Sequence, residues 1–350
     1  MKILKRFIKV LLQTFYALSK INWLSFFKYY KSNTTNVVWV DSLNITTFGI
    51  ETFCWELGYI QAFINRKEYF CICRRIKSFN SKKIFWSPSS RLVNNAIDYP
   101  KQLHQLATQS EKLNNQLFPS AYDVRFLENK VFMYEYFHDN KINTPQTWIF
   151  DTIESLSAAN LNCLFPLLLK GSHSSGSKDI FKFADFDSLV AFLKKSDFLA
   201  IHSKIILQEL LNIRKDLRVT IIGDKIVLHY WRINNSDEWK PTSTSKGNSV
   251  DFVSFPEHWR THILDSFNKT GLKMGAFDVT WNNDDLSTTP LYLEISPRFS
   301  PNPPITDSKY KSEYGKWKKE IFIKNPYYRL QTNIIFEFSN EYVDACFQNS

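Results

Sequence analysis

A chain of 350 residues, 44% hydrophobic and 22% charged, is long enough for two or three domains and too apolar to be disordered. The net charge of +10 comes mostly from residues 1–40, which hold seven Lys or Arg and no acid. The rest is nearly neutral, so we expect no nucleic-acid partner. Five cysteines without a disulfide spacing predict reduced thiols and a cytoplasmic location.

Residues 1–33 form the first predicted segment, a basic amphipathic helix. Its basic residues gather on one face of a helical projection, and large apolar residues fill much of the rest. The longest uncharged run, residues 10–19, is shorter than the about 20 apolar residues that span a bilayer. Three interpretations stay open: residues 1–31 lie on the anionic inner face of a membrane, dock on the protein core or a partner, or form a signal peptide. Against the signal peptide stands the lack of a small-x-small cleavage site before Trp23.

Residues 34–117 are predicted to form a small α/β domain. A strand at 37–40, a helix at 50–64 and a strand at 69–73 have the spacing of a βαβ unit. No G-x-G-x-x-G motif follows the first strand, which argues against a dinucleotide site there. A polar helical stretch at 90–115 follows.

Residues 118–305 form the next predicted domain. A helix at 128–138 is followed by strands at 147–150 and 165–170, the second of which ends in Lys170. A lysine at the end of an apolar strand needs an anion nearby to justify its burial.

A loop rich in small residues follows at 171–178, where six of eight residues are Gly or Ser. Such a loop either wraps phosphate oxygens with its backbone N–H groups or forms an ordinary flexible hairpin. The predicted elements after it are a helix at 187–195, a strand at 204–211, a hairpin around Gly223-Asp224 and a helix at 256–270.

Residues 275–302 are predicted to form a β-hairpin whose short apolar strands flank a polar turn. Each strand carries one acid, Asp278 and then Glu294, and Arg298 follows closely. Buried acids on adjacent strands usually share a cation or a proton, and hard oxygen ligands beside a guanidinium suit a magnesium ion that serves a nucleotide. The alternative is a structural salt bridge between Glu294 and Arg298. Residues 306–350 are predicted to be a helical tail without chemistry.

Taken in order, these pieces resemble the ATP-grasp superfamily of the carboxylate-amine ligase type. The resemblance covers about residues 118–302, and residues 37–117 match more loosely the small α/β domain that usually precedes the grasp. It implies an ATP-grasp fold of two α+β subdomains that hold ATP and Mg2+ between them. The implied reaction joins a small-molecule carboxylate to an amine through an acyl phosphate and releases ADP and phosphate.

The resemblance also assigns nucleotide-binding residues. Lys130 in LENK matches the lysine that reaches the nucleotide phosphates, and Lys170 matches the second nucleotide lysine. Asp216 in KDLR matches the acid that holds the ribose hydroxyls. The hinge QELL is assigned to adenine and the loop at 171–178 to the β- and γ-phosphates. The residues concerned are Gln208, Glu209 and Leu210 in the hinge, and Gly171, Ser172, Ser174, Ser175 and Gly176 in the loop.

Catalysis and metal binding fall to the strands around the hairpin. Arg232 and Arg298 match arginines near the transferred γ-phosphate, and Asp278 and Glu294 match the magnesium ligands. Many members carry Asn two residues after the glutamate, where this chain has Ser296, a weaker metal ligand. Attack of a carboxylate on the γ-phosphate needs these charges rather than a protein nucleophile. The alternatives are a kinase on the same fold and a non-catalytic ATP-binding module at a membrane.

Overall fold

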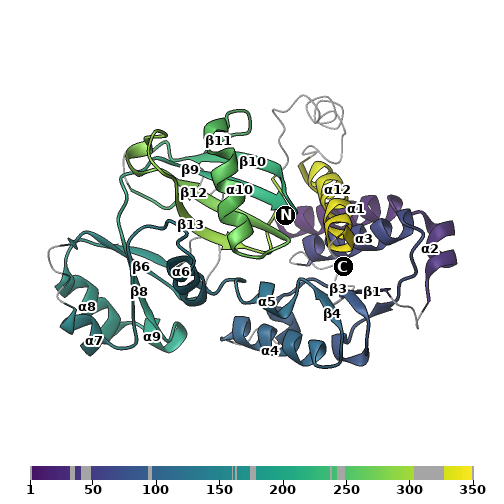
Figure 1. Cartoon of the computed structure of the whole chain (residues 1–350), viewed down its shortest axis with the longest axis horizontal. Coiled ribbons are helices and arrows are strands. Elements are labelled where there is room, and N and C mark those ends of the chain that lie inside the picture. Colours follow the sequence, from purple (N-terminus) through teal and green to yellow (C-terminus); the bar gives the residue numbers. More distant parts are fainter. Residues whose placement is uncertain are drawn as a thin grey trace. The chain divides into compact units, whose positions relative to one another are not determined.

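A computed structural model describes residues 2–31, 36–40, 49–93, 97–159, 161, 164–173, 179–236, 239–242, 249–302 and 327–348. The described chain is a mixed α/β protein, as predicted, and its strands form three sheets (Figure 1). It divides into two compact units, Met1–Val124 with Phe299–Ser350, and Arg125–Arg298. Within the described ranges, no helix is both long and apolar enough to cross a membrane.

The first unit holds a parallel sheet with the strand order β2-β1-β3-β4. Its strands are β1 (Asn36–Trp39), β2 (Ile72–Cys73), β3 (Lys83–Phe85) and β4 (Gln116–Phe118). Helix α3 (Ile50–Asn65) connects β1 to β2 and completes the predicted βαβ unit, because a strand buried along its whole length needs covering elements. Helix α4 (Tyr99–Glu111) is shorter than the stretch expected at 90–115, since Pro100 fixes its first turn.

Helices from both ends of the chain meet in the first unit (Figure 1). They are α1 (Lys2–Ser19), α2 (Trp23–Tyr29) and α12 (Tyr327–Gln348). The expected N-terminal helix is thus interrupted, and Asn22 caps the start of α2 through its side chain. Helix α1 docks on the protein itself: Gln13 Nε2 donates to Thr332 Oγ1 at 3.1 Å, and Tyr16 Oη donates to Asn333 Oδ1 at 2.7 Å.

The second unit contains an antiparallel sheet with the strand order β5-β8-β6-β7. Leu167 and Leu169 alternate along β6 and are buried with Leu189 and Leu193 of α8 in one core, because a strand turns every second side chain to the same face. The elements of this part are α6 (Lys130–Asp139), β5 (Thr147–Phe150), α7 (Ile153–Ala158), β6 (Leu167–Lys170), β7 (Ile180–Phe183), α8 (Phe186–Lys195), α9 (Phe198–Ile201) and β8 (Ile205–Glu209).

A second antiparallel sheet in the same unit has the order β11-β10-β9-β12-β13. The predicted turn joins β9 to β10, and Gly223 takes a φ of 59°, which glycine adopts without strain. The hairpin expected at 275–302 is β12 paired with β13. The elements are β9 (Lys215–Ile222), β10 (Lys225–Ile233), β11 (Ser249–Asp251), α10 (Arg260–Lys269), β12 (Met274–Thr280) and β13 (Leu291–Ser296).

Candidate active site

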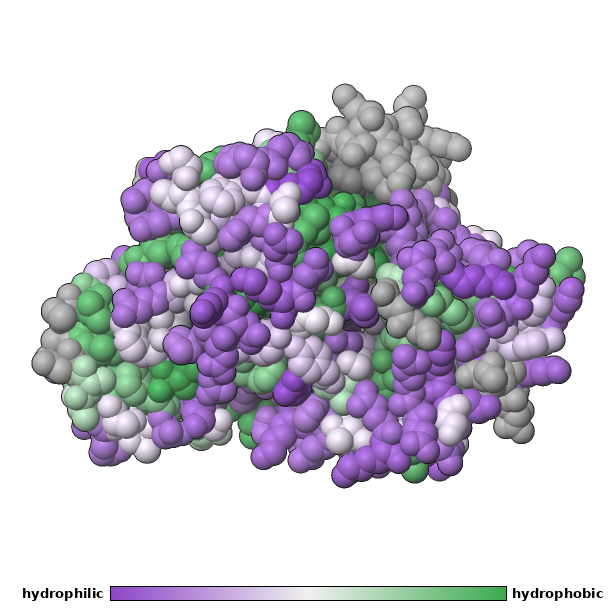
Figure 2. Space-filling view, in the orientation of Figure 1, coloured by the Kyte–Doolittle hydropathy of each residue, from purple (hydrophilic) through white to green (hydrophobic). Residues whose placement is uncertain are grey.

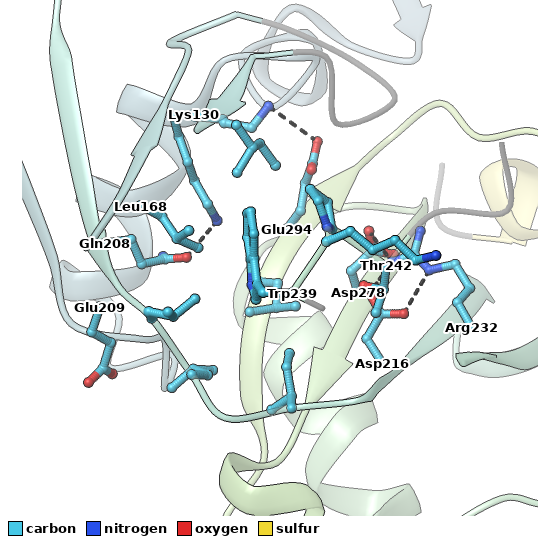
Figure 3. Close-up of a pocket in the computed structure, with 18 residues that line it drawn as sticks. Lys130, Leu168, Gln208, Glu209, Asp216, Arg232, Trp239, Thr242, Asp278 and Glu294 are labelled. Atoms are coloured by element: carbon cyan, nitrogen blue, oxygen red, sulfur yellow. Dashed lines mark hydrogen bonds and ion pairs between the residues drawn. The ribbon is translucent and has the colours of Figure 1, made fainter. Parts of the chain in front are cut away.

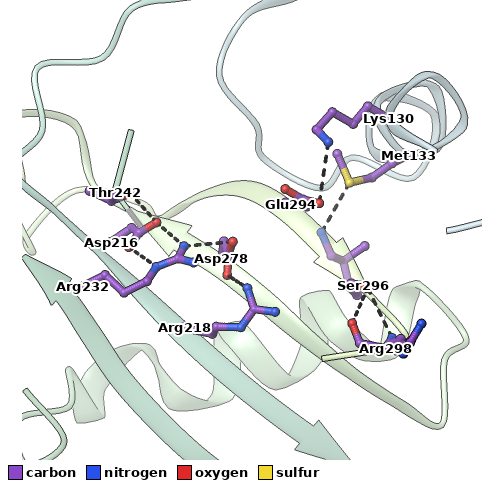
Figure 4. Close-up of polar contacts among 11 residues, drawn as sticks. Lys130, Met133, Asp216, Arg218, Arg232, Thr242, Asp278, Glu294, Ser296 and Arg298 are labelled. Carbon is purple, nitrogen blue, oxygen red and sulfur yellow. Dashed lines mark hydrogen bonds and ion pairs between the residues drawn. The ribbon is translucent and has the colours of Figure 1, made fainter. Parts of the chain in front are cut away.

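Charged side chains line one face of the five-stranded sheet. The strand register places Asp278 directly opposite Glu294 on one side and opposite Arg218 on the other. Asp216, two residues before Arg218 on β9, faces Arg232 of β10. Because residues two apart point to the same face of a strand, the register alone gathers these five side chains. Figure 4 shows them along the strands.

The two arginines hold the two aspartates in a continuous chain of ion pairs. Arg232 Nε donates to Asp216 Oδ1 at 2.8 Å, and Arg232 Nη2 lies 2.9 Å from Asp278 Oδ2. Arg218 Nη1 donates to the other oxygen of Asp278, at 2.7 Å. Burial alone would raise the pKa of Asp278, but Arg218 and Arg232 lower it below its ordinary value. Asp278 is therefore ionised although it is buried.

Lys170, at the end of β6, is a buried cation whose hydrogen-bond acceptors are neutral. Its Nζ donates to Gln208 Oε1 at 2.5 Å and to Tyr134 Oη at 2.9 Å. Burial lowers the pKa of Lys170 to about 8, although Glu294 and Asp278 oppose the shift. A buried cation whose hydrogen-bond acceptors are all neutral favours the binding of an anion beside it.

Lys130, the first residue of α6, reaches toward the sheet acids. Asn129 caps this helix by accepting from Phe132 N. Lys130 Nζ lies 3.8 Å from Glu294 Oε1, and its backbone N–H donates to Ser172 O at 2.9 Å. Lys130 thus touches both the strand that carries Glu294 and the start of the predicted phosphate loop.

A single pocket collects most of the predicted site residues (Figure 3). It is lined from both sheets of the second unit, with an apolar wall that includes Leu168, Ile180 and Leu293. The predicted residues that line it are Lys130, Lys170, Gln208, Glu209, Leu210, Asp216, Arg232, Asp278 and Glu294. These residues span more than 160 positions of the sequence, so the fold brings together what the motif order only suggested.

The side chains of the hinge residues Gln208 and Glu209 form hydrogen bonds with other residues of the same subdomain. Gln208 Nε2 donates to Thr147 Oγ1 at 2.9 Å while its Oε1 accepts from Lys170. Glu209 Oε1 accepts from Gln146 N at 2.8 Å. The side chains of the hinge are therefore fixed before any ligand arrives.

The predicted loop at 171–178 is described only at its start. Gly171 and Ser172 are buried, and Gly171 N donates to Asp179 O at 2.8 Å, which joins the two ends of the loop. A Cβ at Gly171 would lie 2.6 Å from the His202 ring, so only glycine fits there. Ser174, Ser175 and Gly176 lie outside the described residues. Neither Gly171 nor Ser172 lines the pocket.

Two further predicted residues, Ser296 and Arg298, also do not line the pocket. Ser296 Oγ donates to Arg298 O at 2.6 Å and accepts from Arg298 N at 3.2 Å (Figure 4). This turn uses the proton and one lone pair of the Ser296 hydroxyl.

The acids Asp278 and Glu294 offer the hard oxygen ligands that magnesium prefers. In the described chain, no group of three or more His, Cys, Asp or Glu side chains is arranged to hold a metal. Both oxygens of Asp278 are bonded to arginines, whereas Glu294 is partly exposed in the pocket. The pair would fit a divalent metal ion only if Asp278 released an arginine and other ligands completed the coordination.

Several residues in or next to the pocket were not predicted from the sequence. Arg218 and Tyr134 do not line the pocket but bond to residues that do. Arg218 could have been found, because it stands two residues after Asp216 on a strand and shares its face. Tyr134 follows Lys130 by one helical turn. Trp239 projects into the pocket, and Thr242 Oγ1 donates to Asp216 Oδ2 at 2.7 Å (Figure 3). No sequence periodicity could have placed this irregular segment.

Comparisons with known proteins identify the fold. No family model matches the chain, and no curated protein matches it in sequence. Among solved structures, a RimK-domain ATP-grasp protein from Sphaerobacter thermophilus is 14% identical, with a TM-score of 0.54, and the match covers 87% of this chain and 98% of the other. D-cycloserine synthetase DcsG is 12% identical, with a TM-score of 0.54 and coverage of 87% and 99%. The ATP complex of D-alanine–D-alanine ligase from Bacillus anthracis is 12% identical, with a TM-score of 0.52 and coverage of 88% and 97%. The chain therefore has the ATP-grasp fold, as its motifs predicted.

Proposed function

We propose that this protein is an ATP-dependent ligase that joins a carboxylate to an amine through an acyl phosphate. The observation that carries the proposal is the pocket in which Lys130 and Lys170 face the acids Asp278 and Glu294. Cations on one wall and carboxylates on the other suit a polyphosphate bound with a metal ion. The ATP-grasp fold supports the same choice, since solved ligases share it.

We assign ATP to this pocket with its base beside the hinge. Gln208 and Glu209 already bond within the subdomain, so the base contacts fall to the hinge backbone up to Leu210 and to the apolar wall. Lys170 is the anchor for the phosphates, because a phosphate would supply the anion that its burial requires. The loop at 171–178 remains the predicted cover of the β- and γ-phosphates.

Asp278 and Glu294 would hold magnesium, with Ser296 as the predicted third ligand. The metal would neutralise charge on the phosphates and on the oxygens between them. Arg232 and Arg298 are the predicted cations at the transferred group. Arg232 is the nearer of the two to the acids, since it bonds to Asp278.

The reaction follows from this charge distribution. A carboxylate oxygen of the first substrate attacks the γ-phosphorus, and the bond to the β-phosphate oxygen breaks to release ADP. The amine then attacks the acyl carbon, loses a proton and displaces phosphate. Lys130, Lys170 and Arg232 hold the negative oxygens while charge shifts between them, which is where fixed cations lower a barrier.

Product analysis with the Glu294→Gln variant tests the proposal. Wild-type protein with Mg-ATP and mixed carboxylates and amines should release ADP and phosphate only when both substrates are present, with a product that has lost one water. Glu294→Gln should lose at least about 100-fold of this turnover, because it removes a metal ligand. The matched control Glu257→Gln, at an exposed surface pair with Arg260, should keep it. A product that has gained a phosphoryl group would identify a kinase instead.

We place this activity in the cytoplasm, at the inner face of a membrane. The placement rests on the surface of the first two helices, where exposed apolar side chains and basic residues occur together. Substrates attached to or released near a membrane would then lie within reach.

A further inference from the structure

Exposed large apolar side chains are concentrated at one place in the described chain. Of fifteen such residues, eight fall within the first 30 positions. They are Leu4, Phe7, Ile8, Phe15, Trp23, Leu24, Phe27 and Tyr30. Single exposed apolar residues are normal on any protein, but a cluster marks a contact surface.

Four of these side chains form a stripe along α1. Leu4, Phe7, Ile8 and Phe15 are spaced by three, four and eleven residues, which places them on one side of a helix. The opposite side of α1 is already used, since Ala17 is fully buried and Gln13 bonds to α12. The stripe is therefore left over after the helix has docked on its own unit.

Helix α2 carries two of the three most exposed large apolar residues in the described chain. None of its residues is buried, and the side chains of Leu24 and Phe27 are 88% and 73% exposed. Figure 2 shows hydrophobic atoms beside hydrophilic ones on the surface where Figure 1 places α2.

The backbone of α2 is nevertheless held in place at both ends. Asn22 N donates to Gln61 Oε1 at 2.9 Å before the helix, and Lys31 N donates to Phe70 O at 2.8 Å after it. Phe26 packs edge-on against Phe70 with ring centroids 5.2 Å apart. A short helix fixed in this way keeps its outward side chains exposed at no further ordering cost.

The basic residues near the exposed apolar side chains of α1 and α2 indicate which kind of partner this surface binds. Residues 1–40 carry seven basic residues and no acid, and the described side chains of Lys9, Lys28 and Lys31 are exposed. Exposed apolar and aromatic groups on helices that also carry exposed lysines suit the interface of an anionic bilayer, where the rings enter the headgroup boundary and the amines meet phosphates.

We infer that the stripe on α1 and the outer face of α2 form a membrane-contact surface, with Leu24 and Phe27 as the groups that enter the bilayer. The inference rests on the proposed membrane location and names its residues; it does not depend on the ligase reaction. It differs from the expectation of one continuous helix over residues 1–31, because the chain turns at Asn22 and only the outer faces stay free of the core.

Flotation of the full chain with vesicles tests the inference. Vesicles of phosphatidylcholine alone are compared with vesicles that contain about 30% phosphatidylserine. The variant Leu24→Glu/Phe27→Glu places two acids at the proposed entry point. The matched control Ile97→Glu/Val253→Glu places them at exposed apolar residues elsewhere.

The wild type and the control should float with anionic vesicles, and Leu24→Glu/Phe27→Glu should bind at least about tenfold less. Equal thermal midpoints of the two variants would show that the loss is not unfolding. If the wild type does not float with anionic vesicles, the proposed membrane location is wrong. If it binds and Leu24→Glu/Phe27→Glu binds equally, this surface assignment fails while the location stands. Light scattering that shows a wild-type dimer and a monomeric Leu24→Glu/Phe27→Glu variant would make the face a self-association surface and overturn the inference.

Discussion

Replacing Lys170 with methionine separates the cost of burying this amine from its proposed use. Methionine keeps the length and apolar stem of lysine but removes the charge. The exposed Lys182 on the neighbouring strand gives the matched control, Lys182→Met. If Lys170 is a phosphate anchor, the variant should fold more stably without nucleotide and bind ATP more weakly.

The magnitude follows from the pKa of Lys170 and from its hydrogen bonds. Lowering the pKa from 10.5 to about 8 corresponds to about 3 kcal/mol against the protonated amine in the folded state. Methionine also loses the two hydrogen bonds to Gln208 and Tyr134, at a cost of about 1 kcal/mol each. The net gain for Lys170→Met is about 1 kcal/mol at pH 7. In a unit of this size that raises the melting temperature by about 2–4 °C.

The pH dependence has a definite sign. Between pH 8 and 10.5 the unfolded chain keeps the Lys170 proton that the folded chain has lost, so wild-type stability rises with pH relative to the variant. Urea denaturation should show that, from pH 7 to pH 9.5, the free energy of unfolding of the wild type rises by about 2 kcal/mol relative to that of Lys170→Met. The Lys182→Met control should show no such change.

Nucleotide binding completes the test. Isothermal titration with Mg-ATP should show affinity reduced by about tenfold to hundredfold in Lys170→Met, as expected for a lost charged hydrogen bond. Reduced stability at pH 7 with unchanged ATP affinity would refute the reasoning, because Lys170 would then be a structural residue.

Two further predictions concern the acids and the aromatic wall of the pocket. Asp278→Asn should destabilise the protein by about 3 kcal/mol at pH 7, because it leaves two buried guanidinium groups without their shared counterion. The lowered pKa of Asp278 means that its contribution is complete above its ordinary value of 3.8 and is lost as the pH falls through the lowered value. In urea denaturation, the difference in the free energy of unfolding between wild type and Asp278→Asn should therefore decrease toward pH 3. The control Asp224→Asn, at an exposed residue, should unfold with the same free energy as the wild type. A difference for Asp278→Asn that does not change with pH would contradict the assignment. A non-hydrolysable ATP analogue should change the fluorescence of the wild type, and Trp239→Phe should lose that change while the control Trp23→Phe keeps it. Equal signals in both variants would place the nucleotide away from Trp239.

The periodicity of apolar residues and the turn-forming residues were enough to predict most of the strands and hairpins. The strand predicted at 147–150 is β5 with the same bounds, since β-branched and aromatic residues follow a proline there. The hairpin at Gly223 followed from the glycine between two β-branched runs. The placement of Asp278 and Glu294 on adjacent strands also followed from the hairpin, whereas their direct pairing depends on a register shift between Asp278 and Val279.

Other features depend on contacts that sequence spacing does not record. The break between α1 and α2 is set by the Asn22 cap and the bond from its backbone to Gln61, far along the chain. The fixed hinge side chain of Gln208 depends on Thr147 and Lys170, which come from two other strands. Long-range partners of this kind become visible only once the register is known.

The two roles inferred for Asp216 and Arg232 compete with each other in the folded protein. Motif matching put Asp216 at the ribose and Arg232 at the γ-phosphate, which are at opposite ends of the ATP triphosphate. The strand register instead places them face to face, joined by a two-point ion pair that Thr242 extends. Separating a buried pair of this kind costs about 3 kcal/mol or more unless new partners replace both halves. ATP offers such partners, since its phosphate can take Arg232 and its ribose hydroxyls can donate to Asp216. We therefore expect the pair to open on binding, so that part of the intrinsic ATP affinity offsets the cost of separating Arg232 from Asp216.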